Sequence, residues 1–295
     1  MISQTSFISY LQNEKQYSKH TIIAYQKDIE DFKRFLDEEF SSMSLLEVDY
    51  FQVRAWIAEL SNQNLAHKSI NRKLSSLKTF YNFLLKTSQV EVSPMQKLKS
   101  LKTPKSLSTP FSVKEMEDVF KSIEVTDFTS ARNRLIIELL YATGMRRAEL
   151  ISLKISDIDL VKQQLKINGK RNKQRIVPLY QQVCDHISIY LRYKSEAGLT
   201  LNYLLVTKKN IQLYPSLVYN IVNNTFKQHS TKSKTSPHIL RHTFATHLLN
   251  KGANLNAIKE LLGHESLSST EIYTQNSMEQ LKQSYYKNHP RVTKN

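Results

Sequence analysis

The sequence predicts a mainly α-helical protein with one small antiparallel β-sheet, divided into two domains. A chain of 295 residues exceeds the usual size of a single hydrophobic core. Hydrophobic residues make up 40% of the chain and only five residues are glycine, which is typical of packed, helix-rich domains with few special turns. A proline-containing stretch that separates two helical regions supplies the expected boundary.

Residues 1–101 are expected to form several helices. Ser18 is a typical N-cap residue, and the apolar side chains that follow it recur at helical spacing. Similar stripes cover residues 53–60 and 70–84. The next stretch contains two prolines and several small polar residues, which disfavour a helix. Residues 102–110 are therefore the predicted linker.

Residues 111–295 are expected to be mostly helical, with one β-hairpin. An apolar helix ends near Gly144, and a short helix follows from Arg146. Residues 165–167 and 175–179 have a strand-like composition and are joined by a loop containing Asn and Gly. This pattern predicts two antiparallel strands with a charged tip between them.

Further helix boundaries can be placed in the last third of the chain. Ser236 and Pro237 fit the N-cap and first position of a helix that stops at Gly252. Another helix is expected to end at Gly263. Residues 268–271 fit a capping box, which places Tyr273 in the second turn of one more helix.

The charge of the chain favours a polyanionic partner. Lys and Arg number 42 against 26 Asp and Glu, a net charge of +16. The first 100 residues hold 13 basic and 11 acidic side chains, and the remaining 195 hold 29 and 15. Nucleic acid is the expected partner, ahead of an anionic membrane. A soluble basic protein without such a partner is the open alternative.

Composition also excludes several classes. The one cysteine, Cys184, rules out an internal disulfide and a cysteine-built zinc site. No apolar stretch approaches the roughly 20 residues that span a bilayer, and the first ten residues do not resemble a signal peptide. The expected location is the cytoplasm.

Two groups of basic residues are candidates for contacts to a nucleic-acid backbone. The first lies on the predicted helix around residues 70–84, and the second lies on the hairpin. An ordinary solvated surface would explain both groups equally well. The candidates are Lys68, Arg72, Lys73 and Lys78 on the helix, with Arg171, Lys173 and Arg175 on the hairpin.

Residues suited to phosphate chemistry occur at two predicted helix starts. His238 and Arg241 are three apart near a helix N-terminus, where backbone N–H groups favour an anion. A buried histidine and a salt-bridged arginine would look the same in sequence. Arg146 follows the helix stop at Gly144, and the alternative for it is pairing with Glu149.

Tyr273 is a candidate nucleophile because the common metal-dependent motifs of phosphoryl transfer do not occur in the sequence. There is no Walker loop, no His-Glu-x-x-His motif and no tight carboxylate cluster with ligand spacing. The basic half of the chain instead offers arginines, a lysine, histidines and this tyrosine. Such a set suits a metal-free phosphoryl transfer, in which side-chain cations replace the metal.

The order of the motifs resembles that of the tyrosine recombinases, also called the phage integrase family, and most closely its Xer branch. Residues 17–25 resemble the core-binding domain of that branch, and the likeness covers nearly the whole chain. The motifs in the second domain are Ala142–Leu150, Gly169–Lys170, Ser236–His247, Leu261–His264 and Tyr273–Thr274.

This resemblance implies a two-domain DNA clamp, with a helical, SAM-like core-binding domain at 1–101 and an α+β catalytic domain at 111–295. It also implies site-specific cleavage and rejoining of DNA through a 3′-phosphotyrosyl intermediate, without metal, ATP or another cofactor. The residues that match the catalytic positions of the family are Arg146, Lys170, His238, Arg241, His264 and the nucleophile Tyr273.

The partners implied by the resemblance are double-stranded DNA with a specific site and a tetramer on that DNA. The tetramer can be built from one chain or from this chain and a second Xer-like recombinase, with an accessory activator as a further partner. Residues 277–289 have helical spacing, so this tail either docks on a neighbouring protomer or packs on its own domain.

The expected role is resolution of chromosome dimers. An integrase or transposase of a mobile element would use the same chemistry and stays open. A DNA-binding relative without catalytic activity is the alternative from another class.

Overall fold

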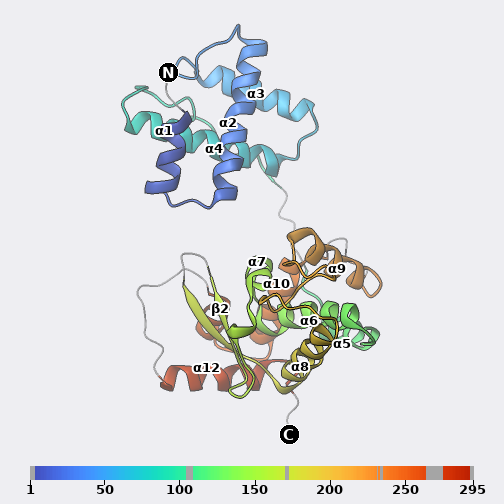
Figure 1. Cartoon of the computed structure of the whole chain (residues 1–295). Coiled ribbons are helices and arrows are strands. Elements are labelled where there is room, and N and C mark those ends of the chain that lie inside the picture. Colours follow the sequence, from blue (N-terminus) through green and yellow to red (C-terminus); the bar gives the residue numbers. More distant parts are fainter. Residues whose placement is uncertain are drawn as a thin grey trace. The chain divides into compact units, whose positions relative to one another are not determined.

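The computed structural model describes residues 4–103, 109–169, 173–230, 232, 235–263 and 275–292, with the backbone only for residues 275–279. The chain divides into two compact units, residues 1–106 and 107–295 (Figure 1). Each unit has its own hydrophobic core. The predicted fold class is confirmed, since the elements are mostly helices together with one small antiparallel sheet.

In the described part of the first unit, all regular secondary structure is helical. Ser18 caps α2 as predicted, because its Oγ accepts a hydrogen bond from the backbone N–H of Thr21 at 3.2 Å. The indole of Trp56 is buried at 2% exposure and lies 4.9 Å from the ring of Phe32. The elements are α1 Gln4–Ser9, a π-helical turn Tyr10–Glu14, α2 Lys19–Glu39, α3 Tyr50–Asn62 and α4 His67–Lys86.

A buried carboxylate joins α2 to α4. Asp28 is 1% exposed and accepts hydrogen bonds from Arg72 at 2.7 Å and Ser76 at 2.6 Å. Burial raises the pKa of Asp28, but the bonds from Arg72 and Ser76 and the charge of Lys73 outweigh it, so the pKa lies below its ordinary value. The two helices are therefore held by charge as well as by apolar packing.

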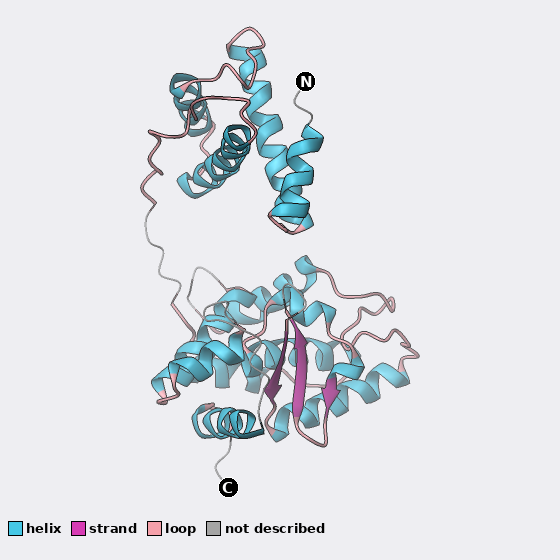
Figure 2. Ribbon diagram, turned by 90° about the vertical axis from the view of Figure 1, so that its left-hand side faces the viewer, coloured by secondary structure: helices cyan, strands magenta, loops and turns pink. Residues whose placement is uncertain are grey.

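The second unit combines helices with the sheet (Figure 2). Its last helix follows the motifs singled out in the sequence. The elements are α5 Val113–Ser122, α6 Phe128–Thr143, α7 Arg147–Ser152, a 3-10 turn Ile155–Asp157, β1 Ile158–Asp159, β2 Gln164–Asn168, β3 Gln174–Pro178, α8 Gln181–Glu196, α9 Pro215–Lys227, α10 Pro237–Asn250, α11 Leu255–Leu262 and α12 Gln275–Asn288.

The sheet is antiparallel with the order β1-β2-β3. Leu165 pairs with Val177, and Ile167 pairs with Arg175, so these four side chains share the buried face. Side chains on the other face of β2 are exposed, as the period of two along a strand requires. The predicted hairpin is confirmed. The two-residue strand β1 was too short to be predicted.

Helix α6 packs in the core of the second unit, and its second half, residues 135–143, is buried on all sides. Leu135, Ile136 and Leu139 have no exposed surface, and the helix contacts both α8 and α10. It ends as predicted at Gly144, which has a left-handed backbone with φ of 59° and donates its N–H to the carbonyl of Leu140 at 3.1 Å. The end of this helix is therefore fixed inside the core.

The C-terminal helix α12 packs on its own unit. Leu281 and Tyr285 are buried in the core of that unit, and the Tyr285 hydroxyl donates to the carbonyl of Ala142 at 3.0 Å. His289 is enclosed by the rings of Tyr141 and Tyr180, each 5.1 Å away, and burial lowers its pKa to about 3. Of the two expectations for the tail, the structure therefore shows packing within the chain.

Two exclusions drawn from the sequence can be compared with the structure. Cys184 is a free, buried thiol on α8, in agreement with a small core residue. In the part of the chain that the structure describes, no helix has both the length and the apolar character needed to cross a bilayer.

Gly144→Ala is expected to destabilise the second unit by roughly 2–5 kcal/mol. The added Cβ would lie 2.4 Å from Cδ1 of Phe244, and the backbone φ of 59° is itself unfavourable for alanine. Denaturant unfolding followed by circular dichroism measures the change.

Gly198→Ala is the matched control. Its φ is +66°, and no atom lies within 4 Å of the added Cβ, so only the backbone cost of roughly 1–2 kcal/mol remains. Equal losses of stability in the two variants would contradict the packing argument for Gly144.

Candidate active site

Arg146 is held at the start of α7 by the carboxylate of Glu149. Its backbone N–H donates to Oε2 of Glu149 at 2.8 Å, and its Nη1 donates to Oε1 at the same distance. The pairing considered as the alternative for Arg146 is therefore present. The guanidinium nevertheless keeps 45% of its side-chain surface exposed, so it can contact a ligand as well.

Arg241 lies in the second turn of α10 and is 7% exposed. Its Nη1 donates to the carbonyl of Gly144 at 2.7 Å, and its Nη2 donates to the carbonyl of Leu262 at 2.8 Å. Burial, followed by the positive charges of Arg146 and Arg175, lowers the pKa of Arg241 to about 10. The side chain remains protonated at neutral pH, without a carboxylate partner among the described residues.

Arg175 corrects one expectation drawn from the sequence. It was grouped with the exposed basic residues of the hairpin, but the structure buries it at 5% exposure on the inner face of β3. Its Nη2 donates to Oε2 of Glu149 at 2.8 Å, and its Nε donates to the carbonyl of Leu261 at 2.8 Å. It therefore belongs to the interior of the site and not to a DNA-facing surface.

The C-terminal end of α11 brings the three arginines together. Three consecutive carbonyl oxygens each accept from one guanidinium: Leu261 from Arg175, Leu262 from Arg241 and Gly263 from Arg146, the last at 3.5 Å. A helix C-terminus carries a partial negative charge, which favours cations there.

Among the described residues, Glu149 is the carboxylate that Arg146 and Arg175 share. Burial raises its pKa, but hydrogen bonds and charge from Arg175, together with the bonds from Arg146, lower the pKa below its ordinary value. With Arg241 included, three positive charges face one negative charge. This surplus can hold a phosphate group and stabilise the charge that builds up on it.

His238 is exposed on the first turn of α10, three residues before Arg241. The pair therefore lies on one side of the helix near its N-terminus, as predicted from the spacing. The structure does not bury this histidine. Ser236 occupies the predicted N-cap position, but its hydroxyl makes no capping hydrogen bond.

Lys170, Arg171, His264 and Tyr273 lie outside the described residues. Only their described neighbours can be placed. Gly169 donates its N–H to the carbonyl of Lys173 at 2.7 Å, and this bond joins the two sides of the hairpin. Gly263 ends α11 with a left-handed φ of 66°, as predicted.

The predicted basic face of α4 is only partly exposed. Lys68, Lys78 and Arg72 are exposed, although Arg72 also donates to Asp28. Lys73 corrects the prediction, because only 11% of its side chain is exposed and its Nζ donates to Asp31 at 2.7 Å. In the second unit, Lys173 is exposed beside the hairpin tip.

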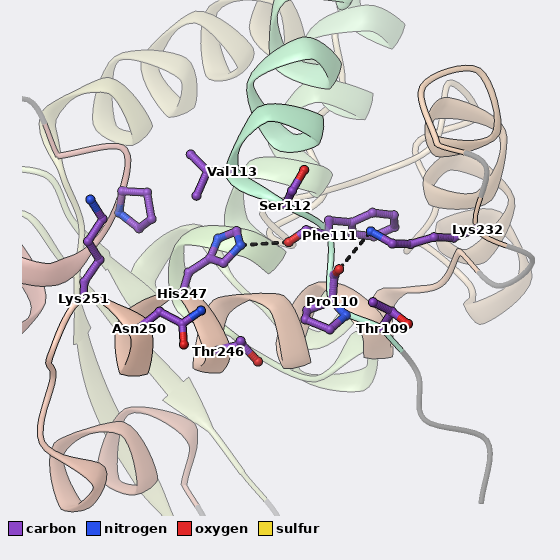
Figure 3. Close-up of a pocket in the computed structure, with 11 residues that line it drawn as sticks. Thr109, Pro110, Phe111, Ser112, Val113, Lys232, Thr246, His247, Asn250 and Lys251 are labelled. Atoms are coloured by element: carbon purple, nitrogen blue, oxygen red, sulfur yellow. Dashed lines mark hydrogen bonds between the residues drawn. The ribbon is translucent and has the colours of Figure 1, made fainter.

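Sequence analysis did not anticipate a buried network beside this site. Nδ1 of His247 is hydrogen-bonded to the hydroxyl of Tyr141 at 2.8 Å, and its Nε2 is hydrogen-bonded to the carbonyl of Phe111 at 2.8 Å. His247 and Phe111 line a 420 Å³ pocket, where Lys232 donates to the carbonyl of Pro110 at 2.8 Å (Figure 3). Of the predicted catalytic residues that the structure describes, Arg146, His238 and Arg241, none lines this pocket.

The spacing of Arg175 from an apolar residue of the same strand indicates its inward position. It lies two residues before Val177 in a strand, so the two side chains share a face, and Val177 is buried. Among the described residues, no group of three or more His, Cys, Asp or Glu side chains has an arrangement that could hold a metal ion.

Comparison with known sequences gives matches over most of the chain. Residues 109–280 match the phage integrase family, and residues 5–88 match the N-terminal SAM-like domain of phage integrases. A tyrosine recombinase XerC from Bacillus licheniformis is 38% identical, with 98% of this chain and 97% of that protein covered. The XerC of Bacillus subtilis is 35% identical, with 98% and 96% covered.

Solved structures give a similar result. The XerH site-specific recombinase bound to its difH substrate is 25% identical with a TM-score of 0.67, and the match covers 90% of this chain and 78% of that chain. The integrase of transposon Tn1549 in complex with transposon right-end DNA has a TM-score of 0.71 at 19% identity, with 94% and 98% covered. At that identity the likeness concerns the fold.

Glu149→Gln is expected to destabilise the second unit by roughly 3–5 kcal/mol, because it removes the carboxylate from a buried ion pair with Arg175. The amide oxygen of Gln can still accept from the backbone of Arg146, so the helix start is kept.

The same variant should change the response to acid. The folded pKa of Glu149 lies below its ordinary value of 4.5, so its stabilisation is fully present above that pH and is lost as the pH falls through the folded pKa. Unfolding free energies of both proteins, measured from pH 7 downwards, should converge below pH 4.5. A constant difference over this range would contradict the assignment.

Proposed function

The chain belongs to the phage integrase family and is a tyrosine recombinase, and on this premise we propose that it exchanges DNA strands at a specific chromosomal site in the manner of the Xer branch. The proposed outcome is resolution of chromosome dimers. The XerC relatives support this role, since they match over nearly the full length of both chains.

The observation that carries the proposed chemistry is the meeting of Arg146 and Arg241 at the end of α11. Arg146 and Arg241 are 95 positions apart in the sequence, yet they donate to the consecutive carbonyls of Gly263 and Leu262. Phosphodiester cleavage places extra negative charge on the non-bridging oxygens, and fixed guanidinium groups stabilise that charge. The half-exposed Arg146 is open to the DNA phosphate.

In the proposed reaction, the phenolic oxygen of Tyr273 attacks the phosphorus of one backbone phosphate. His238 accepts the proton of Tyr273, and the bond from phosphorus to the 5′-oxygen breaks. Lys170 gives a proton to the leaving 5′-oxygen, and His264 adds a hydrogen bond to the phosphate.

The products of this step are a 3′-phosphotyrosyl link and a free 5′-hydroxyl. The number of phosphoester bonds stays the same, so their energy is kept. A 5′-hydroxyl from a second duplex reverses the step and joins the strands anew. Neither ATP nor a metal takes part in this scheme.

Basic side chains of both units make the proposed DNA contacts. Lys68, Arg72 and Lys78 would contact phosphates from the core-binding domain, with Arg171 and Lys173 doing so from the hairpin. Exchange between two duplexes needs four cuts, so a DNA-bound tetramer is proposed, of this chain alone or with a second Xer-like recombinase. The proposed location is the cytoplasm.

Tyr273→Phe is expected to abolish covalent attachment to DNA, because the nucleophilic oxygen is removed, while DNA affinity stays within about twofold. A suicide substrate, nicked near the cleavage position so that the released piece diffuses away, traps the covalent product for detection by gel electrophoresis. Mapping the attached residue identifies the nucleophile directly.

The wild-type control is assayed in EDTA and should give the covalent product at an unchanged rate. Full attachment by Tyr273→Phe would overturn the choice of nucleophile, and loss of wild-type cleavage that magnesium restores would overturn the metal-free scheme. A supercoiled plasmid with two copies of a candidate chromosomal site then tests the Xer role, and recombination only at mobile-element ends would refute it.

A further inference from the structure

Arg175 is the buried arginine of the site that the proposed chemistry does not use. An arginine so far from water needs partners for its donors, since an unpaired buried charge is costly. All its described bonds go to groups of the site: both nitrogens of the fork to Glu149, at 3.2 and 2.8 Å, and Nε to the carbonyl of Leu261. A side chain on β3 thus joins α7 to the end of α11.

The backbone lies beside this side chain at two glycines, and the approach is tight at Gly263. A Cβ on Gly263 would lie 3.2 Å from Cδ and 3.3 Å from Nη1 of Arg175, closer than ordinary packing. On the other side, a Cβ on Gly169 would lie 3.9 Å from the same Nη1 and 3.8 Å from Oε1 of Glu149. The guanidinium therefore lies between the backbone at the end of β2 and the backbone at the end of α11.

These two glycines directly precede two of the residues to which the proposed function gives a catalytic role. Lys170 follows Gly169 and His264 follows Gly263 in the sequence. Consecutive Cα atoms are about 3.8 Å apart. A contact that fixes the backbone of each glycine therefore also limits where the Cα atom of the next residue can lie. The carboxylate that Arg175 binds is the one that holds Arg146.

We propose that Arg175 is a positioning residue for strand cleavage, which aligns the hairpin carrying Lys170 with the arginine pair by bridging β3, Glu149 and the end of α11. This inference rests on the proposed function, in which Lys170 protonates the leaving oxygen. A lysine at position 175 would keep the charge but cannot offer the planar fork that binds Glu149 and Leu261 together.

Arg175→Lys tests the proposal in single-turnover cleavage of the suicide substrate. We expect cleavage to slow about 100-fold, the usual effect of displacing a catalytic group by about 1 Å, with DNA affinity unchanged. Lys166→Gln is the matched control, because Lys166 lies on the exposed face of the same sheet, and it should cleave at the wild-type rate. Circular dichroism verifies that each variant is folded.

A double-mutant cycle with Lys170→Ala separates positioning from a general structural effect. If Arg175 acts through Lys170, the variant with both changes is no slower than Lys170→Ala alone. Additive losses, or no loss in Arg175→Lys, would overturn the proposal. Arg175→Gln gives the same cycle if the lysine variant does not fold.

A substrate with sulfur in place of the scissile 5′-oxygen distinguishes failure of the inference from failure of the proposed function. A thiolate leaves without a proton, since thiols have a pKa near 8.5. Both Lys170→Ala and Arg175→Lys should then cleave within about threefold of wild type. If sulfur rescues Lys170→Ala but not Arg175→Lys, Arg175 does not act through Lys170. If it rescues neither, Lys170 is not the proton donor and the proposed function is wrong at that step.

Discussion

A single buried carboxylate makes it possible for three guanidinium groups to occupy one small volume. Glu149 binds Arg146 and Arg175, and the end of α11 supplies a carbonyl to each arginine. Without these acceptors, desolvation and mutual repulsion would separate the three cations. The compensation is incomplete, as the lowered pKa of Arg241 indicates. In the proposed function, the DNA phosphate neutralises the remaining positive charge.

In the second unit, the ends of helices lie at this cluster, and not their middles. Helix α6 stops at Gly144, whose carbonyl accepts from Arg241, and α11 stops at Gly263. Each stop exposes carbonyl groups that have no partner within their own helix. The site thus uses unsatisfied helix ends as acceptors, and α6, whose second half is buried in the core, holds one of these ends in place. The carbonyl of Gly144 thus ends a core helix and also binds Arg241 of the site.

Much of this arrangement could be predicted because the signals are local. The stops at Gly144 and Gly263, the cap at Ser18 and the hairpin depend on a few adjacent residues, and the structure has them where the sequence predicted them. The direction of charged side chains could not be predicted in the same way. Lys73 meets Asp31, 42 positions away, and which lysine of a basic helix meets a distant carboxylate is decided by tertiary packing.

Arg175 is a second charged side chain whose burial was not predicted. Its basic neighbour Lys173 lies before the first residue of β3 and is exposed, whereas Arg175 lies inside the strand, on the same face as the buried Val177. Of the six residues that match the catalytic positions, Arg146, His238 and Arg241 can be placed, and the first and last of these meet at α11. Resemblance identified these positions, while the acceptors that hold them emerged only from the three-dimensional contacts.

The anchoring of α12 has a consequence for the broken DNA. Tyr273 is two residues before the first residue of this helix, and Leu281, Tyr285 and His289 fix the helix in the core. In the proposed reaction, a strand esterified to that tyrosine is joined to the chain two positions before this anchored helix. The cut end would then stay covalently attached to the second unit until it is rejoined, so that the proposed reaction would release no free DNA end.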